Sequence, residues 1–504
     1  MLRTYWHEYT GFRYLKRNLL FVFLPVMVFT LLGFSVMGYH PGIEDDGVYL
    51  AAIKADINPS LYPHDANFFR LQLQATVFDR VMARFVEGTG ISVAWAELLI
   101  QFVSLFLILW ATLGIARFIF EEKHAQWAAV AMVTAMFTLP VAGTALYIAD
   151  QHLHPRNMAT ALIMLAVWCI LKDKRWQAIP LLLVAILLHP IMGALGISFC
   201  VFSVLAFREA VPARVRALQS SLAAGVPLGW IFESPTPSWH HALNTRTYYY
   251  LYRWEWYEWL GAIAPLVLFW LLWRLAKRYG HNNLSRLALA VFAYGIFQQI
   301  VAMVMLTPTA LIRLTPLQPM RYLQLVYIFM AMVGGGLLGR FLLKTNWWRW
   351  AIFLLVFNGS MYAVQRETYD SSTHIELPGV APSNDYLQAF EWIRLNTPTD
   401  AYFTLDPRYL AAPHEDFHSF RALAERSQLA DGIKDTAVVT QVPELGPVWE
   451  KQEDAQKGWT KFTLADFQRL KAEFGVNWTL VNYPQPPAGL DCKWHNATLA
   501  VCEV

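Results

Sequence analysis

Three consecutive carboxylates, Glu44, Asp45 and Asp46, follow the first long apolar segment of the chain, within residues 42–49. Carboxylates of this kind can take a proton from a reacting group or hold a cation. They cannot face lipid, because burying a charge in a membrane is costly. The Gly, Pro and Tyr residues around the triplet indicate a turn that directs side chains. A solvated acidic loop is the competing interpretation.

Arginines near the ends of predicted membrane helices are the cations that could meet an anionic substrate. Arg156 lies in the turn 150–157, near the start of a helix, where the helix dipole favours an anion. Arg313 and Arg321 bracket the proline-containing loop 314–320 and suit a phosphate, which arginine binds through two parallel hydrogen bonds. A hydrated loop and interfacial snorkelling are the competing interpretations.

Histidines and aromatic residues accompany these charges. His154 lies in the same turn as the first arginine, and His189 lies at the tip of a predicted helical hairpin. Either could contact a substrate, although a single histidine is usually structural. The segment 248–256 is dense in aromatic residues and contains Arg253. Its rings could stack on a sugar or on lipid, and an interfacial aromatic belt is the competing interpretation; the rings concerned are Tyr248, Tyr250, Trp254 and Trp256.

The composition predicts a polytopic membrane protein. Hydrophobic residues make up 56% of the chain and charged residues 15%, against about a quarter charged in soluble proteins. Basic residues lie in short clusters between apolar runs, which argues against nucleic-acid binding. No small-residue cleavage site follows the first apolar run, so we expect a retained anchor. About eleven spans are predicted, over residues 18–38, 92–118, 125–148, 157–171, 177–189, 191–207, 216–232, 257–276, 285–306, 319–343 and 347–365.

The basic clusters also predict the orientation of the chain. With the N-terminus inside, every predicted inner segment carries lysine or arginine, as the positive-inside rule requires. Reading residues 177–207 as one helix would place the basic cluster 208–216 outside, so a hairpin with His189 at its outer tip is favoured. The C-terminus is then extracytoplasmic, and we expect a bacterial inner membrane.

Two outer regions are long enough to carry function besides the aromatic segment. In the first, about 39–91, spaced apolar residues over 66–87 suit an interfacial amphipathic helix. The second, 366–504, is predicted to be a soluble α/β domain beside a transmembrane module over 1–365. Helices are expected at 390–394 and 464–474, and strands at 401–405 and 478–482. One of the charged stretches 425–427 and 431–435 could close over a cavity; a solvated rim is the alternative.

Four cysteines bear on the compartment. Cys169 and Cys200 lie in predicted membrane helices and are expected to be inert packing residues. Cys492 and Cys502 flank a short terminal segment. With that segment outside the cytoplasm, a disulfide between these two residues is expected.

Carboxylates and arginines thus collect on one face of a polytopic protein, and here the chain resembles the GT-C superfamily of multi-spanning glycosyltransferases. Several members carry an Asp-Asp/Glu-x-x-aromatic motif in the first outer loop, which Asp45-Asp46-Gly47-Val48-Tyr49 resembles. The many spans, the long first loop and the outward C-terminal region are similar too. Within this superfamily, the chain is similar to the protein mannosyltransferase and aminoarabinose transferase group.

The resemblance implies an inverting transfer from a polyprenyl-phosphate-linked sugar to a lipid, glycan or protein acceptor. Asp45 then takes the place of the catalytic base and Asp46 that of its acidic neighbour. The candidate substrate or phosphate-binding residues are Arg156, Arg313, Arg321, His154, His189, Tyr49 and Arg253. The sequence establishes no cofactor, and a divalent metal is one possibility; its candidate ligands are Glu44, Asp45, Asp46 and Asp150.

One departure bears on that metal. Some GT-C families show a second acidic motif near the start of the fourth span, where this chain has His154-Pro155-Arg156-Asn157.

A transporter or flippase for a lipid-linked or anionic substrate is a competing function, although no internal repeat supports it. A non-catalytic scaffold of the same fold is the third alternative.

Overall fold

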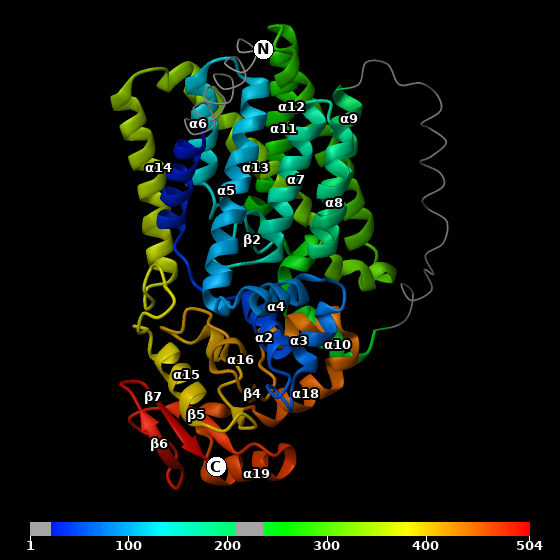
Figure 1. Cartoon of the computed structure of the whole chain (residues 1–504). Coiled ribbons are helices and arrows are strands. Elements are labelled where there is room, and N and C mark those ends of the chain that lie inside the picture. Colours follow the sequence, from blue (N-terminus) through cyan, green and yellow to red (C-terminus); the bar gives the residue numbers. More distant parts are fainter. Residues whose placement is uncertain (1–21, 208–234) are drawn as a thin grey trace, which may run out of the picture.

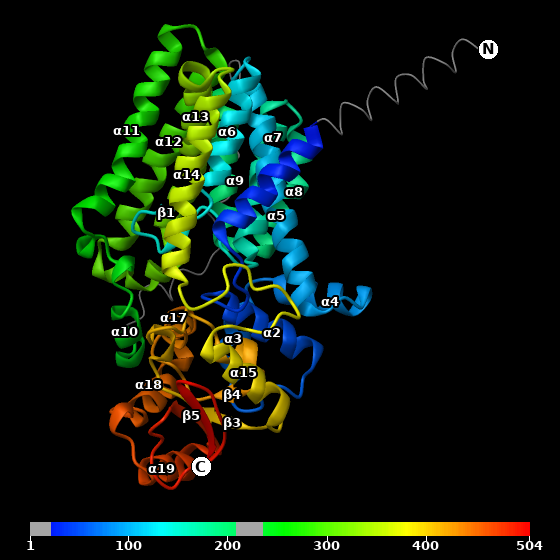
Figure 2. The ribbon, with the colours of Figure 1, turned by 90° about the vertical axis from the view of Figure 1, so that its left-hand side faces the viewer.

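The computed structural model describes residues 22–207 and 235–504, which are mostly helical. Long apolar helices form a bundle at one end of the molecule, and a mixed sheet lies at the other end (Figure 1). Between them lie three short helices of the first loop, α2 (Asp46–Ile57), α3 (Asn67–Leu73) and α4 (Phe78–Thr89), as the turned view also shows (Figure 2). A helical bundle with a small C-terminal α/β region is therefore confirmed.

The bundle has the length and composition of a membrane protein. Five described helices can cross a membrane by these criteria: α5 (Val93–Ile119), α9 (Pro190–Phe207), α11 (Trp256–Arg278), α12 (Asn282–Leu306) and the segment Pro319–Leu343 around α13 (Leu323–Leu338). Val22–Met37, α7 (Pro155–Leu171) and α8 (Arg175–Leu188) are shorter apolar helices. Large apolar side chains such as Leu183, Ile300 and Leu355 point outward, which suits a lipid environment.

The predicted count of about eleven spans stays a prediction. The span 216–232 and the start of 18–38 lie outside the described residues. The final span of that prediction is the helix α14 (Trp347–Thr368).

The predicted span 125–148 is wrong. Its first part is the short helix α6 (Lys123–Ala135), and the rest is a hairpin of β1 (Pro140–Val141) and β2 (Leu146–Tyr147). Pro140 lacks the N–H that a helix needs, and Gly143 turns with φ +63 while the Trp254 ring lies 2.3 Å from where its Cβ would be. A partly buried hairpin therefore replaces the second half of the predicted membrane helix.

The predicted hairpin around His189 is confirmed, whereas the helix expected over 66–87 is divided in two. α8 and α9 pack side by side on either side of His189, so the hairpin is confirmed (Figure 1). The single helix expected over 66–87 is two helices, α3 and α4. At the break, the Val77 N–H donates to Leu187 O at 3.1 Å and Thr76 Oγ1 donates to Leu188 O at 2.7 Å. The first loop is thus bonded to the end of α8.

The C-terminal segment contains a five-stranded sheet in the order β4-β3-β5-β7-β6. The expected helices and strands are confirmed in α15 (Asp385–Asn396), α19 (Leu464–Phe474), β3 (Tyr402–Thr404) and β5 (Trp478–Asn482). β3 is parallel to β4 (Ser427–Gln428) and β5, whereas β7 (Leu499–Glu503) is antiparallel to β5 and β6 (Asp491–His495). Cys492 and Cys502 are joined across β6 and β7. Cys200 is buried in α9 and Cys169 half-buried in α7.

The C-terminal segment shares its core with the rest of the chain. One apolar cluster contains Phe68 of α3, Trp239 of α10 (Pro237–Asn244), Tyr249 of the turn η3 (Thr247–Tyr249), Val438 of α17 (Lys434–Gln441) and Trp449 of α18 (Gly446–Ala455). The first loop, the aromatic segment and the C-terminal region therefore fix one another in space, and the residues at their junction have set positions.

The first loop and the C-terminal segment pack closely at Gly47 in α2. A Cβ there would lie 2.3 Å from Ser419 Cβ, so a side chain has no room. We expect Gly47→Val to lower the free energy of unfolding by about 1–3 kcal/mol through overpacking. Gly88→Ala in α4, where nothing lies within 4 Å, is the matched control. Melting of the detergent-purified proteins tests this, and equal melting temperatures would contradict it.

Candidate functional site

A cavity of about 740 Å³ lies where the bundle, the first loop and the C-terminal segment meet. Its charged lining residues are Glu44, Asp45, Asp150, Arg156, Arg246, Glu258, Arg321 and Lys434, and the hairpin 140–147 forms one wall. A second cavity of about 650 Å³ lies within the C-terminal segment, beside Tyr386 and Tyr409, and holds none of the predicted site residues. The first cavity is therefore the candidate site.

Asp45 reaches this cavity because of the turn that precedes α2. Glu44 is in the left-handed region at φ 51, which redirects the chain immediately before the helix. Asp45 is the residue before the helix, and its carboxylate makes no capping bond to the helix N-terminus. The Asp45 side chain is 43% exposed and lines the cavity, so it can face a ligand there.

Two basic side chains flank the Asp45 carboxylate. Lys434 Nζ lies 3.1 Å from Asp45 Oδ1 and 2.6 Å from Glu44 Oε2. His154 Nε2 lies 3.7 Å from Asp45 Oδ2. The Arg156 N–H donates to His154 Nδ1 at 2.9 Å, so the neutral imidazole carries its proton on Nε2, facing Asp45.

These neighbours determine the charge on each group. Desolvation alone would raise the pKa of Asp45, but Lys434, His154 and Arg156 outweigh it and hold the pKa well below its usual range. Burial and then Arg156 lower the pKa of His154 to about 4. Burial opposes the charge of Lys434, yet Asp45 and Glu44 raise its pKa. At neutral pH the site holds an ionised Asp45, a cationic Lys434 and a neutral His154.

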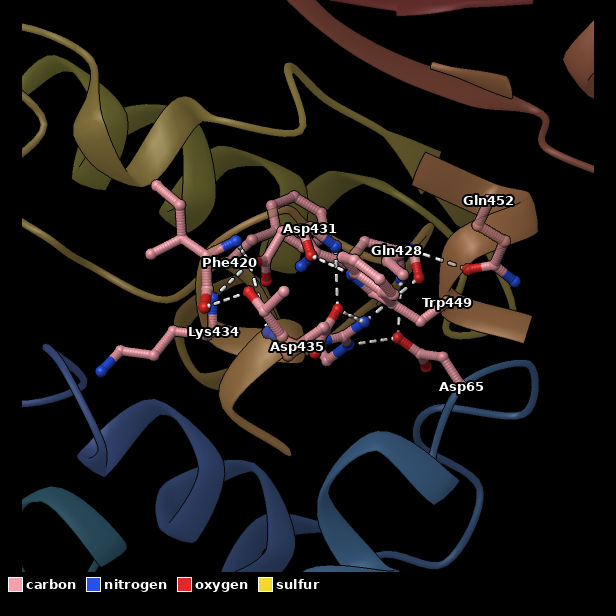
Figure 3. A network of polar contacts seen from close by, with 12 residues as sticks. Asp65, Phe420, Gln428, Asp431, Lys434, Asp435, Trp449 and Gln452 are labelled. Atoms are coloured by element: carbon pink, nitrogen blue, oxygen red, sulfur yellow. Dashed lines mark hydrogen bonds and ion pairs between the residues drawn. The ribbon is translucent and has the colours of Figure 1, made fainter. Parts of the chain in front are cut away.

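Lys434 is held in place by a buried network behind it. Arg421, on α16 (Phe420–Ala424), donates to Asp435 at 2.7 and 2.9 Å and pairs with Asp65 of the first loop. Asp431 Oδ1 accepts from the Lys434 N–H. Figure 3 shows Asp65, Asp431 and Asp435 inside this network, with the Lys434 side chain extending away from it toward the first loop. Ile433 and Lys434 of the stretch 431–435 thus line the cavity; that this stretch closes over it stays a prediction.

Guanidinium groups line the cavity together with these carboxylates. Arg156 is buried and bonds Asp150 through Nε at 3.1 Å and Nη2 at 2.7 Å. Arg321 donates from Nε to Gln318 at 2.8 Å and, among the described residues, has no carboxylate within salt-bridge distance. Arg246 Nη2 donates to Ile433 O. Arg321 and Arg246 therefore line the cavity without a carboxylate partner among the described residues, and either guanidinium group can bind an anionic ligand.

Several predicted residues do not line the cavity. Asp46 turns back and accepts from the Gly42 N–H at 2.7 Å, and burial raises its pKa to about 7. Arg313 stacks on Trp239 with 5.3 Å to the ring centroid. Arg253 lies over Tyr250 at 4.7 Å. These side chains have structural contacts in the regions around the cavity.

Tyr49 and His189 lie beside His154 and do not line the cavity themselves. Tyr49 is buried with its ring 5.1 Å from His154. His189 accepts from the Met192 N–H at 3.3 Å and lies 5.8 Å from the His154 ring. Of the four aromatic residues expected to meet a sugar, Tyr248 lines the cavity, whereas Trp254 packs on Gly143.

Other cavity residues were not singled out from the sequence. His152 is buried, and neither ring nitrogen has a hydrogen bond within the described part of the chain. Burial lowers its pKa to about 3, so it is a neutral donor or ligand. The signal for His152 in the sequence was its position in the turn 150–157, two residues after Asp150. Lys434 lies in the charged stretch 431–435, but nothing in the sequence paired it with Asp45, and Arg246 gave no local signal, because both roles depend on contacts across the chain.

A divalent cation could be held here only by rearrangement. Glu44, Asp45, Asp150 and His152 offer the oxygen and nitrogen donors that such ions take. The ammonium of Lys434, however, lies between Glu44 and Asp45 and already neutralises both. The proposed ligand Asp46 faces away from the cavity, and Asp150 is paired with Arg156.

Comparisons with known proteins give a distant likeness. No protein-family model and no curated protein matches the chain. Among solved structures, the oligosaccharyltransferase of Archaeoglobus fulgidus in the apo form aligns with a TM-score of 0.46 and 11% identity over 91% of this chain and 69% of that chain. The archaeal oligosaccharyltransferase AglB from Archaeoglobus fulgidus, in complex with an inhibitory peptide and a dolichol-phosphate, aligns with the same values. The Archaeoglobus fulgidus oligosaccharyltransferase of the apo structure, in its complex with Zn and sulfate, aligns with a TM-score of 0.41 and 12% identity over 91% of this chain and 68% of that chain. We draw no residue assignment from a likeness of this extent.

Proposed function

We propose that the protein is a membrane glycosyltransferase that moves a sugar from a polyprenyl-phosphate donor to an extracytoplasmic acceptor, with inversion. The observation that carries the proposal is the cavity shared by Asp45 and the guanidinium groups of Arg156 and Arg321. A base and a phosphate clamp must both reach one sugar, and these residues line the same space without pairing directly. The apolar helices adjoining it supply a path for a polyprenyl chain.

The chemistry follows from the residue types. Asp45 takes the proton of the acceptor nucleophile as that nucleophile attacks the anomeric carbon. The bond from that carbon to the phosphate oxygen breaks on the opposite face of the sugar, which inverts the configuration. The departing polyprenyl phosphate gains charge, which Arg321 and Arg156 stabilise. Lys434 keeps Asp45 ionised before the acceptor arrives.

The direct test is reconstitution of the full chain in liposomes with radiolabelled polyprenyl-phosphate sugars and candidate acceptors. Label that moves from the lipid to an acceptor supports a transferase. Label that crosses the bilayer while remaining on the lipid supports a flippase. Neither event with any of several sugars supports the scaffold alternative.

Arg321 provides a prediction specific to the phosphate clamp. We expect Arg321→Gln to lower kcat/KM for the lipid donor about 10–100-fold, since a hydrogen bond to a charged group contributes about 1.5–3 kcal/mol. Arg84→Gln, on the exposed face of α4, is the control. Initial rates at varied donor concentration measure the effect, and an unchanged kcat/KM would remove Arg321 from the clamp.

A further inference from the structure

A buried cluster of metal-ligating side chains lies beside the cavity but outside it. His40, Glu376 and His418 each offer one donor atom, and these atoms lie within 4.8 Å of one another. His40 Nδ1 is 2.8 Å and His418 Nε2 3.1 Å from Glu376 Oε1. Both histidines are fully buried. The three residues come from the first loop, the segment after α14 and the loop before α16.

The hydrogen bonds around the cluster orient its donors as a metal site requires. Glu415 O lies 2.9 Å from His418 Nδ1 and accepts its proton. In a neutral ring, Nε2 then presents its lone pair to the Glu376 carboxylate, an arrangement that needs a cation or a proton between them. A second partner that fixes the tautomer in this way is typical of metal-binding histidines.

Unpartnered polar atoms lie in and beside the cluster. His40 Nε2 is buried and has no hydrogen bond within the described residues. Both carboxylate oxygens of Glu415 are likewise buried without a partner there. Buried polar atoms of this kind are costly unless a partner such as a bound ion satisfies them.

We infer that His40, Glu376 and His418 bind a divalent transition metal of the Zn²⁺ type that fastens the first loop to the C-terminal segment. Two nitrogens and one oxygen suit Zn²⁺ better than Mg²⁺ or Ca²⁺, which prefer oxygen ligands. Tetrahedral Zn²⁺ needs its donors about 3.3 Å apart. The two histidine nitrogens lie 2.8 and 3.1 Å from Glu376 Oε1, and all three donor atoms lie within 4.8 Å of one another.

The position of this site gives it a role in the cavity. The backbone pairs Tyr39 with Ile375 and Ile43 with His418. The Glu44 N–H donates to Phe417 O at 3.2 Å, and Glu44 and Phe417 both line the cavity. A metal at the cluster would therefore hold the turn that aims Asp45. The inference stands without the proposed transfer reaction.

Metal content of the full chain, purified in detergent, tests the inference. After treatment with EDTA, exposure to Zn²⁺ and removal of excess ion, we expect about one Zn²⁺ per chain. Glu376→Gln and His418→Gln should reduce this at least about tenfold. His414→Gln, an exposed histidine in the same loop, and Asp45→Asn, in the cavity, should retain it. Wild-type protein without Zn²⁺, or variants that bind it equally, would overturn the inference.

A measurement on the unaltered chain covers variants that fail to fold. Hydrogen exchange at residues 38–46 and 414–418 should increase when EDTA removes the metal and return to its former rate with Zn²⁺. Mg²⁺ at the same concentration should not restore it. Exchange that is the same with and without Zn²⁺ would show that a shared proton, and not a metal, joins the three side chains, and would overturn the inference.

Discussion

We expect Asp45→Asn to lower the rate of sugar transfer about 10²–10⁴-fold, the usual contribution of a general base. The substituted amide keeps the shape of the side chain but cannot take the acceptor proton. Asp45 makes no capping bond to α2, and Glu44 still pairs with Lys434 in the variant, so the fold should be retained. Loss of the ion pair between Asp45 and Lys434 should lower the melting temperature without removing the protein. Transfer at saturating donor and acceptor measures the effect.

Two further variants separate lost basicity from lost structure. Glu87→Gln removes an exposed carboxylate from α4, far along the first loop, and should transfer at the wild-type rate. Lys434→Met removes the ammonium that most strongly depresses the pKa of Asp45. The acidic limb of the pH–rate profile should then shift to higher pH, because the base protonates earlier as pH falls. A wild-type profile in Lys434→Met, or full activity in Asp45→Asn, would contradict the assignment.

Local sequence patterns predicted the helices and strands whose ends are determined by neighbouring residues. The helix at 464–474 begins with a capping box, in which Thr463 and Asp466 exchange hydrogen bonds, and ends at Gly475 in the left-handed region. Hydropathy could not separate a membrane helix from a buried hairpin at 125–148. Both bury apolar side chains, and only Pro140 and Gly143 mark the difference.

The high cost of burying a charge in lipid was enough to predict part of the site. Asp45, Arg156 and Arg321 line one cavity, as expected from charged groups that must avoid lipid. Asp45 and Asp46 could not be told apart in this way, because α2 starts between them and sends the second carboxylate back to Gly42. The partner Lys434 lies 389 positions away along the chain, and no spacing rule connects the two.

The second large effect is expected at the buried network that carries Lys434. Arg421 is buried, pairs with Asp65 and Asp435, and lies 5.3 Å from the Phe68 ring centroid. Arg421→Leu would leave two buried carboxylates without their cation (Figure 3). Breaking a buried ion pair from one side costs about 3–5 kcal/mol. We therefore expect a large fall in melting temperature and faster proteolysis of the C-terminal segment.

The matched control is Arg394→Leu on the exposed face of α15, where the ion pair to Glu391 is 3.7 Å long. Exposed pairs contribute about 0–1 kcal/mol, so this variant should melt near the wild type. Adding Asp65→Asn and Asp435→Asn to Arg421→Leu removes the unpaired charges and should recover part of the loss. If the triple variant is no more stable than Arg421→Leu, lost packing on Phe68 outweighs the uncompensated charge. Because the same network presents Lys434 to Asp45, a recovered fold should also recover the pH–rate profile of the wild type.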